Sequence, residues 1–143
     1  MMLSLKQALT IAQVTLEEGA RQGFAPLCVV VLDAGGHALA LLRDEKASIY
    51  RPEIAMAKAA GCLGMGFGGR EIAKRATAVP GFIAALNGIF PKGILPVPGG
   101  VLIRDGAGAL IGAVGVTGDT SDNDEISALA GIAAAGLVAD TGA

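Results

Sequence analysis

The sequence predicts an α+β fold in which an antiparallel central β-sheet is flanked by α-helices, giving three layers, α/β/α. Two observations carry this prediction. Apolar strand-like runs come in pairs joined by short Gly- and Asp-rich turns, which is typical of β-hairpins. Helical segments come before, between and after these pairs, without the regular strand–helix alternation of a parallel sheet. A length of 143 residues fits a single domain, residues 1–143.

The first elements are a helix and a hairpin. Ser4 and Gln7 have the spacing of a capping box, and apolar residues at helical spacing continue until Gly23. A strand is expected over residues 26–32 and its partner over residues 37–43, with turn residues between them. Both strands are apolar at odd and even positions, so we expect both faces of the sheet to be covered.

The rest of the chain predicts two further helical regions, a second hairpin and a last helix. A helix should begin at Pro52 and run to about Gly64, because Pro suits the first helical turn. Short helical pieces are expected between residues 70 and 86. Strands at residues 101–103 and 109–117 flank a Gly- and Asp-rich turn. A final helix is expected to continue to about Asp140.

Composition excludes several classes of protein. The net charge is −2, no block of Lys and Arg occurs, and aromatic residues are only 3%, so nucleic-acid binding is not indicated. The N-terminal residues lack a signal-peptide pattern and no apolar run could span a membrane, so we expect a cytoplasmic protein with no membrane partner. An apolar content of 52% exceeds what a small monomer can bury, which favours a homo-oligomer, a dimer or a higher ring.

The two cysteines do not suggest chemistry. Cys28 lies in an apolar strand and Cys62 on a predicted helix, without CxxC spacing or neighbouring histidines. We interpret them as buried free thiols and expect no metal site.

Lys58 is the most informative charged residue, because it falls among apolar residues on the inward face of the second helix. Its stem can lie along apolar surface while its ammonium pairs with an acid, or it can anchor an anionic ligand in a pocket. The acidic run of residues 119–125 has the same ambiguity. It is explained most simply as a helix cap, but the segment 115–118 leads from a strand into that helix start, where backbone N–H groups can receive an anion.

His37 is the only histidine, and no nucleophile elbow accompanies it, so hydrolase chemistry is not indicated. It is either a partly exposed strand residue or a haem axial ligand. The other residues able to act as axial ligands are Tyr50, Met56, Met65 and the two cysteines. The segment Pro98-Gly99-Gly100 predicts a strained turn, or a place where another group approaches the backbone closely.

An ordered set of segments resembles the GlcG/HbpS family, the haem-degrading and haem-binding proteins that are similar to the C-terminal domain of PduO. The segments are VVVLDAGGHALALLRD, PEIAMAKAAG and PVPGGVLIRDGAGALIGAVGVTGDTSDNDE. The matching residues, in order, are Asp33, Gly36, Arg43, Asp44, Lys58, Ala59, Gly99, Gly100, Gly112, Ala113, Gly115, Thr117, Gly118 and Asp124. The resemblance implies a profilin-like antiparallel sheet, assembly into dimers or rings, and haem binding, sensing or degradation in some members.

These observations lead to two hypotheses. The first is an oligomer that binds haem or a related tetrapyrrole; the predicted ligand-binding residues are Arg43, Lys58, Gly99, Gly100, Thr117, Gly118 and Asp124. The second is an enzyme or accessory protein acting on a small hydroxy- or oxo-acid; its candidate catalytic residues are Lys58, Asp124 and Glu125. The sequence does not decide whether Arg70, Arg75 and Lys92 belong to the pocket or to the surface.

Overall fold

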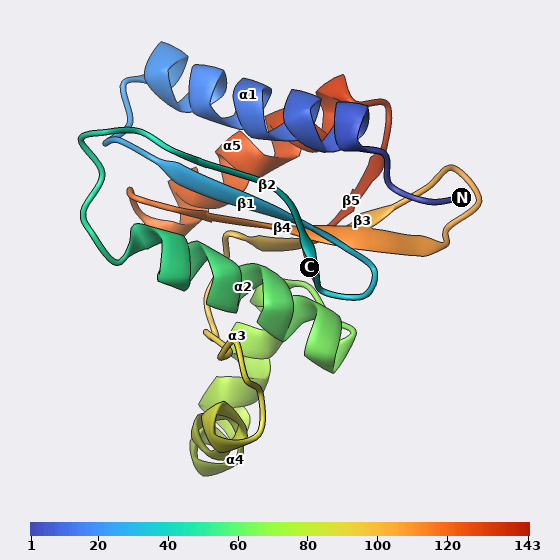
Figure 1. The fold of residues 1–143 in the computed structure, drawn as a ribbon. Helices are drawn as coiled ribbons and strands as arrows, with labels where there is room; N and C mark the ends of the chain where they lie inside the picture. Colours follow the sequence, from blue (N-terminus) through green and yellow to red (C-terminus); the bar gives the residue numbers. More distant parts are fainter.

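The computed structural model describes residues 1–143 as a five-stranded antiparallel sheet with helices on both faces (Figure 1). In chain order the elements are α1 (Leu5–Gln22), β1 (Cys28–Asp33), β2 (Ala38–Arg43), α2 (Arg51–Met65), α3 (Gly69–Ala78), α4 (Pro80–Ala85), the 3-10 helix η1 (Leu86–Gly88), β3 (Gly100–Arg104), β4 (Leu110–Thr117), α5 (Ser121–Ala134) and β5 (Val138–Asp140). The strand order is β2-β1-β4-β3-β5, and every neighbouring pair is antiparallel. The predicted fold class is confirmed.

The layers divide the core in two. Helices α1 and α5 cover one face of the sheet, and α2, with α3 and α4 beyond it, covers the other (Figure 1). In β1, Val29 and Val31 belong to the cluster under α1 and α5, whereas Val30 and Leu32 belong to the cluster under α2. All four are fully buried, which explains why this strand is apolar at every position. None of the helices combines the length and hydrophobicity needed to cross a membrane.

The expectation that both hairpin strands are covered on both faces is wrong for β2. This strand lies at the edge of the sheet and pairs only with β1. Ala40 is buried, but the side chain of Leu41 is 43% exposed. An edge strand is covered by fewer neighbouring elements. Apolar side chains of β2 therefore remain exposed to solvent in the single chain.

The predicted end of the last helix is also wrong. Helix α5 ends at Ala134, and the chain then forms β5, which pairs with β3. Gly136 has a φ of 73°, a left-handed conformation that ends helices, and its N–H donates to the Ala133 carbonyl. Leu137 remains buried beside α5 after the chain has turned. The helical spacing of apolar residues therefore continues beyond the end of the helix, and the sequence pattern does not indicate the strand that follows.

Glycines allow α2 to lie directly on the sheet. A Cβ atom added at Gly115 of β4 would lie 1.9 Å from the Ala55 carbonyl oxygen of α2. One added at Gly100 of β3 would lie 2.6 Å from the Lys58 carbonyl oxygen. No real side chain tolerates such contacts. This close approach places Lys58 over the ends of β3 and β4.

Candidate functional site

Lys58 and Asp124 form a buried ion pair between α2 and the start of α5. The Lys58 Nζ donates to the Asp124 Oδ2 at 3.1 Å and to the Val116 carbonyl at 2.9 Å, and the two side chains are only 4% and 1% exposed. The other Asp124 oxygen accepts the Asp119 N–H at 3.0 Å. Burial lowers the pKa of Lys58 and raises the pKa of Asp124, while the opposite charge of each partner works against these shifts.

Two glycines close over this pair. Gly99 has a φ of 104°, and a Cβ atom there would lie 2.9 Å from the Lys58 Nζ and 2.8 Å from the Val116 carbonyl oxygen. Gly100 lies equally close to the backbone of Lys58. The predicted close approach at Gly99 and Gly100 is therefore confirmed, and the group that approaches is Lys58 of the same chain.

Thr117 and Gly118 lie beside the pair at the end of β4. The Thr117 hydroxyl is buried and accepts a hydrogen bond from the Arg51 Nη1 at 2.8 Å. Gly118 has a φ of 141° and lies against the Pro26 carbonyl, which leaves no room for a side chain. The structure thus brings together five of the predicted ligand-binding residues around Lys58: Gly99, Gly100, Thr117, Gly118 and Asp124.

Arg43 contacts the loop that follows β2 and not the buried ion pair. Its Nη1 donates to the carbonyls of Asp44, Glu45 and Ala47 at 3.2, 3.3 and 2.9 Å, and so it shapes the loop after β2. Because the guanidinium is used on three carbonyls of its own loop, it does not contact Lys58 in the single chain.

Glu125 is turned toward α3 rather than toward Lys58. Its Oε1 accepts from the Arg70 Nε at 3.0 Å, and Arg70 also contacts Asp122 at 2.9 Å. The Glu125 Oε2 is buried without a hydrogen-bond partner. Arg70 is therefore a link between α3 and α5. Arg75 pairs with Glu71 on its own helix and lies over a ring, 4.2 Å from the centroid of Phe67.

The acidic run caps α5, as the simpler interpretation predicted. Thr120 is the N-cap, and its hydroxyl accepts the Asn123 N–H at 3.2 Å. Asp122 and Asp124 lie in the first turn, where negative charge is stabilised by the helix dipole. No group of three or more His, Cys, Asp or Glu side chains is arranged to hold a metal ion.

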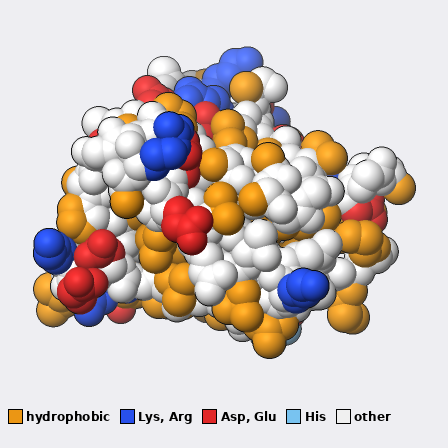
Figure 2. All heavy atoms as spheres, turned by 90° about the horizontal axis from the view of Figure 1, so that it is seen from above, with side chains coloured by type: hydrophobic (Ala, Val, Ile, Leu, Met, Phe, Trp, Pro, Cys, Tyr) orange, Lys and Arg blue, Asp and Glu red, His pale blue; other side chains and the backbone are white.

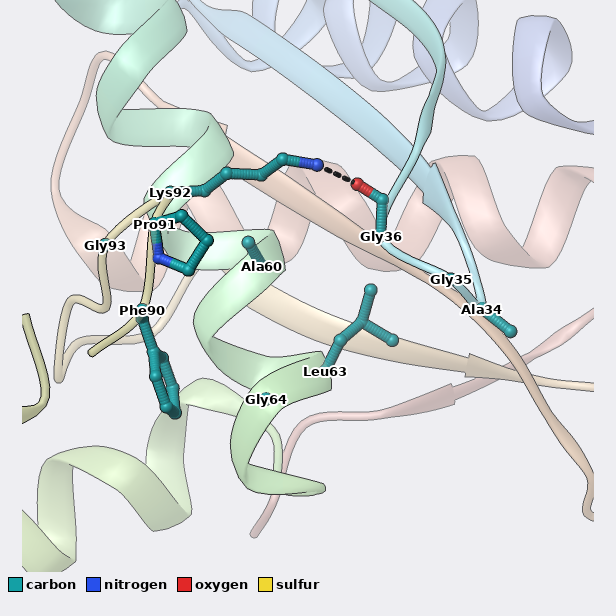
Figure 3. A pocket seen from close by; sticks show the side chains of 10 residues that line it. All are labelled: Ala34, Gly35, Gly36, Ala60, Leu63, Gly64, Phe90, Pro91, Lys92 and Gly93. Atoms are coloured by element: carbon teal, nitrogen blue, oxygen red, sulfur yellow. Dashed lines mark hydrogen bonds between the residues drawn. The ribbon is translucent and has the colours of Figure 1, made fainter.

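The open surface lies on the outer side of α2, away from the ion pair. A cavity of about 340 Å³ opens between α2, the β1–β2 turn and the loop after η1 (Figure 3). A second cavity of about 450 Å³ continues along α2. We call the two together the α2 groove; its lining residues are Ala34, Gly35, Gly36, Leu41, Pro52, Glu53, Met56, Ala60, Leu63, Gly64, Phe90, Pro91, Lys92 and Gly93. None of the sequence-predicted ligand-binding residues lines it.

Lys92 crosses the α2 groove. Pro91 and Lys92 line both cavities, and the Lys92 Nζ donates to the Gly36 carbonyl in the β1–β2 turn (Figure 3). The sequence leaves open whether Lys92 belongs to a pocket or to the surface, and in the structure it lines a pocket. No motif marks the segment from Phe90 to Gly93, because its role depends on a hairpin more than fifty residues earlier in the chain.

His37 follows this turn. Its side chain is 80% exposed, and its Nδ1 lies 3.4 Å from the Asp33 Oδ1. A Cβ atom at Gly35, which lines the groove, would lie 3.0 Å from the same nitrogen. The only histidine is thus an exposed group that follows Gly35 and Gly36, two residues of the groove lining, and its side chain faces Asp33.

These features define a class of protein: a three-layer α+β domain with a fully buried ion pair at one sheet end and an open, largely apolar groove along one helix. A family model for the haem degrading protein HbpS-like family matches residues 3–133. The chain belongs to the HbpS-like family.

Solved structures agree with this assignment. The crystal structure of HbpS is 30% identical, covering 93% of this chain and 89% of its own, with a TM-score of 0.80. A PduOC:heme complex is 22% identical over 96% of this chain and 98% of its own, with a TM-score of 0.85. Klebsiella pneumoniae protein ORFY is 24% identical over 93% and 90%, with a TM-score of 0.81. The last two share the fold. No curated protein matches the chain.

Proposed function

We propose that this protein binds haem or a related tetrapyrrole in the α2 groove. The observation that carries the proposal is the groove itself, an open and mostly apolar surface with a single lysine across it, on a chain of the HbpS-like family. Each of its two cavities is within the usual size range of small-molecule pockets, about 300–1,000 Å³. A haem complex among the similar structures supports the same ligand class.

The groove offers the two kinds of contact that a tetrapyrrole requires. Met56, Ala60, Leu63 and Phe90 present apolar surface to a flat ring system, and Lys92 presents a cation to its acidic side groups. A further cavity of about 510 Å³ lies on the other side of the β1–β2 turn; its lining includes Asp33 and Met1, whose N-terminal ammonium already pairs with Asp105 at 3.8 Å. The α2 groove is the better site for an anionic ligand because Lys92, a lysine without an ion-pair partner, crosses it.

His37 is our candidate for the axial ligand. With its Nδ1 facing the Asp33 carboxylate, its Nε2 is free to bind iron, and a carboxylate behind a ligating histidine fixes the ring and raises its basicity. Bound haem would supply an iron centre able to take small ligands or exchange electrons. Met56 lines the groove and is the alternative ligand.

The enzyme hypothesis receives less support. Lys58 and Asp124 are paired with each other, covered by Gly99, and absent from the lining of every cavity. A catalytic role would require this pair to open to substrate. The buried pair is better suited to fixing α2 against α5, and the ligand-binding role of Lys58 and its neighbours stays a prediction.

We also propose that the protein is a homo-oligomer. Large hydrophobic side chains are exposed on α1, β2, α4 and α5, among them Leu9, Leu41, Phe82 and Ile126. Figure 2 looks down on the face that carries α1 and α5, where hydrophobic atoms are spread between separate groups of charged side chains. Exposed apolar surface of this kind is typical of subunit interfaces.

The experiment is a haem titration of the untagged protein followed by absorbance, beside His37→Ala and Met56→Leu variants. A saturable Soret shift in the wild-type protein, changed by His37→Ala and not by Met56→Leu, supports both the binding and the axial ligand. If Met56→Leu changes the Soret shift and His37→Ala does not, the axial ligand is Met56. A titration that never saturates contradicts haem binding.

A further inference from the structure

We propose that Lys92 is the group that recognises an acidic side group of the ligand, and that it leaves Gly36 to do so, which joins the two halves of the α2 groove. This inference rests on the proposed function, because it concerns how the same groove takes its ligand. The ligand class that follows is a flat, apolar molecule with a carboxylate at its edge.

The contact that Lys92 makes now is easily exchanged. Its side chain is exposed, its one hydrogen-bond partner is the neutral Gly36 carbonyl, and it takes part in no ion pair. A hydrogen bond between an ammonium and a carboxylate is stronger than one to a neutral carbonyl. A ligand carboxylate in the groove therefore competes effectively for Lys92.

The backbone beneath Lys92 is fixed, so only its side chain has to move. The Ile94 N–H donates to the Asn87 Oδ1 at 3.0 Å, and the Ile94 side chain is fully buried against Gly61 of α2. On the other side of the groove, the Gly36 carbonyl belongs to a hairpin turn closed by its own N–H to the Asp33 carbonyl at 3.0 Å. Two fixed walls are thus bridged by one flexible stem, which Figure 3 shows extended between them.

The position of this stem divides the groove. Lys92 lines the cavity beside Ala60 and Leu63 and also the cavity beside Leu41 and Met56. Moving it from Gly36 makes one continuous surface along α2. Glu53 lies at the far end of that surface and repels carboxylates, so the acidic edge of the ligand is directed toward Lys92.

The test compares haem with its dimethyl ester, which has the same ring and no free carboxylate. Both are titrated into the wild-type protein, Lys92→Met, Lys92→Arg and Lys74→Met. Methionine keeps a long apolar stem, arginine keeps the charge, and Lys74 is an exposed lysine on α3 that serves as the matched control. We expect the wild-type protein to prefer haem over the ester by about tenfold or more.

In Lys92→Met this preference should disappear through weaker haem binding, with ester binding unchanged or tighter because the groove is no longer divided. Lys92→Arg and Lys74→Met should keep the preference. If Lys92→Met retains the wild-type ratio while both ligands still bind, the role of Lys92 is overturned and the proposed function stands. If the wild-type protein binds neither form, the proposed function fails and this inference fails with it.

Discussion

Lys58 shows how a single buried residue can organise the end of this sheet. Its ammonium is satisfied by one carboxylate and one carbonyl, and the backbones of β3, β4 and α5 meet around it. Two charges removed from water do not stabilise a fold merely by attracting each other, because both lose hydration. Removing only one of them leaves the other buried and unpaired, and that is the larger cost.

We predict that Lys58→Met lowers the free energy of unfolding by about 3–5 kcal/mol, the usual cost of an unpaired buried charge. The double variant Lys58→Met/Asp124→Asn should regain a large part of this loss, because the remaining amide is neutral. Urea unfolding of the two single variants and the double variant measures the coupling. Additive losses would mean that the pair is not coupled.

The two cysteines should be unreactive toward thiol reagents in the folded protein. Burial raises the pKa of Cys28 to about 11 and that of Cys62 to about 12, so at pH 8 only about one Cys28 in a thousand is a thiolate. A thiol reagent should label neither cysteine until denaturant is added, and both afterwards. Rapid labelling of native protein would contradict their burial.

The same shifts predict how stability depends on pH. In the unfolded chain a cysteine thiol has its ordinary pKa of 9.0 and loses its proton before the folded one does. The unfolded state therefore gains relative to the folded state as the pH rises above 9, and the stability falls up to about pH 11 through Cys28 and up to about pH 12 through Cys62. Thermal melts across this range, compared with melts of a Cys28→Ala/Cys62→Ala variant, isolate the contribution, since the variant should show a shallower decline.

Residue roles were predictable where the pattern is local. The inward position of Lys58, the close approach at Gly99 and the burial of the cysteines follow from helix spacing and residue chemistry. The position of Lys92 in the groove could not be predicted from the sequence. An exposed lysine in a turn has no recognisable pattern, and its contact with the β1–β2 hairpin is known only from the structure.

At the scale of elements, glycines decide how closely α2 lies on the sheet. We predict that Gly115→Ala lowers the free energy of unfolding by about 2–3 kcal/mol, since its methyl group would meet the Ala55 carbonyl and force α2 away from β4. The matched control is Gly81→Ala in α4, where nothing lies within 4 Å, and its effect should lie between none and a gain of about 1 kcal/mol. Equal effects of the two variants would contradict this account of the packing.

The helices and strands were predictable except where the apolar spacing of a helix continued into the strand that follows it. Both hairpins and the helices α1 and α2 follow from turn residues and apolar periodicity, and they agree with the structure to within a few residues. Strand β5 was missed because it has only three residues and follows a buried Leu137 that fits the helical spacing of α5. The glycine at position 136 was the available signal.

For the whole molecule, the single chain leaves apolar surface open at the edge strand β2 and on the outer helices. We predict that sedimentation of the purified protein gives a mass of at least twice the 14.2 kDa of one chain. Replacing the exposed Leu41 by Lys should shift the protein toward smaller species if β2 lies in an interface, because charge on an edge strand opposes pairing. A wild-type monomer at high concentration would contradict the homo-oligomer.

The central claim is that a tetrapyrrole occupies the α2 groove, and the most direct measurement is a crystal structure of the protein with haem. The account predicts haem against Ala60 and Leu63, with a propionate on Lys92 in place of the Gly36 carbonyl and His37 at the iron. Haem bound at the Lys58–Asp124 pair, or in the cavity beside Asp33, with the α2 groove empty, would contradict it.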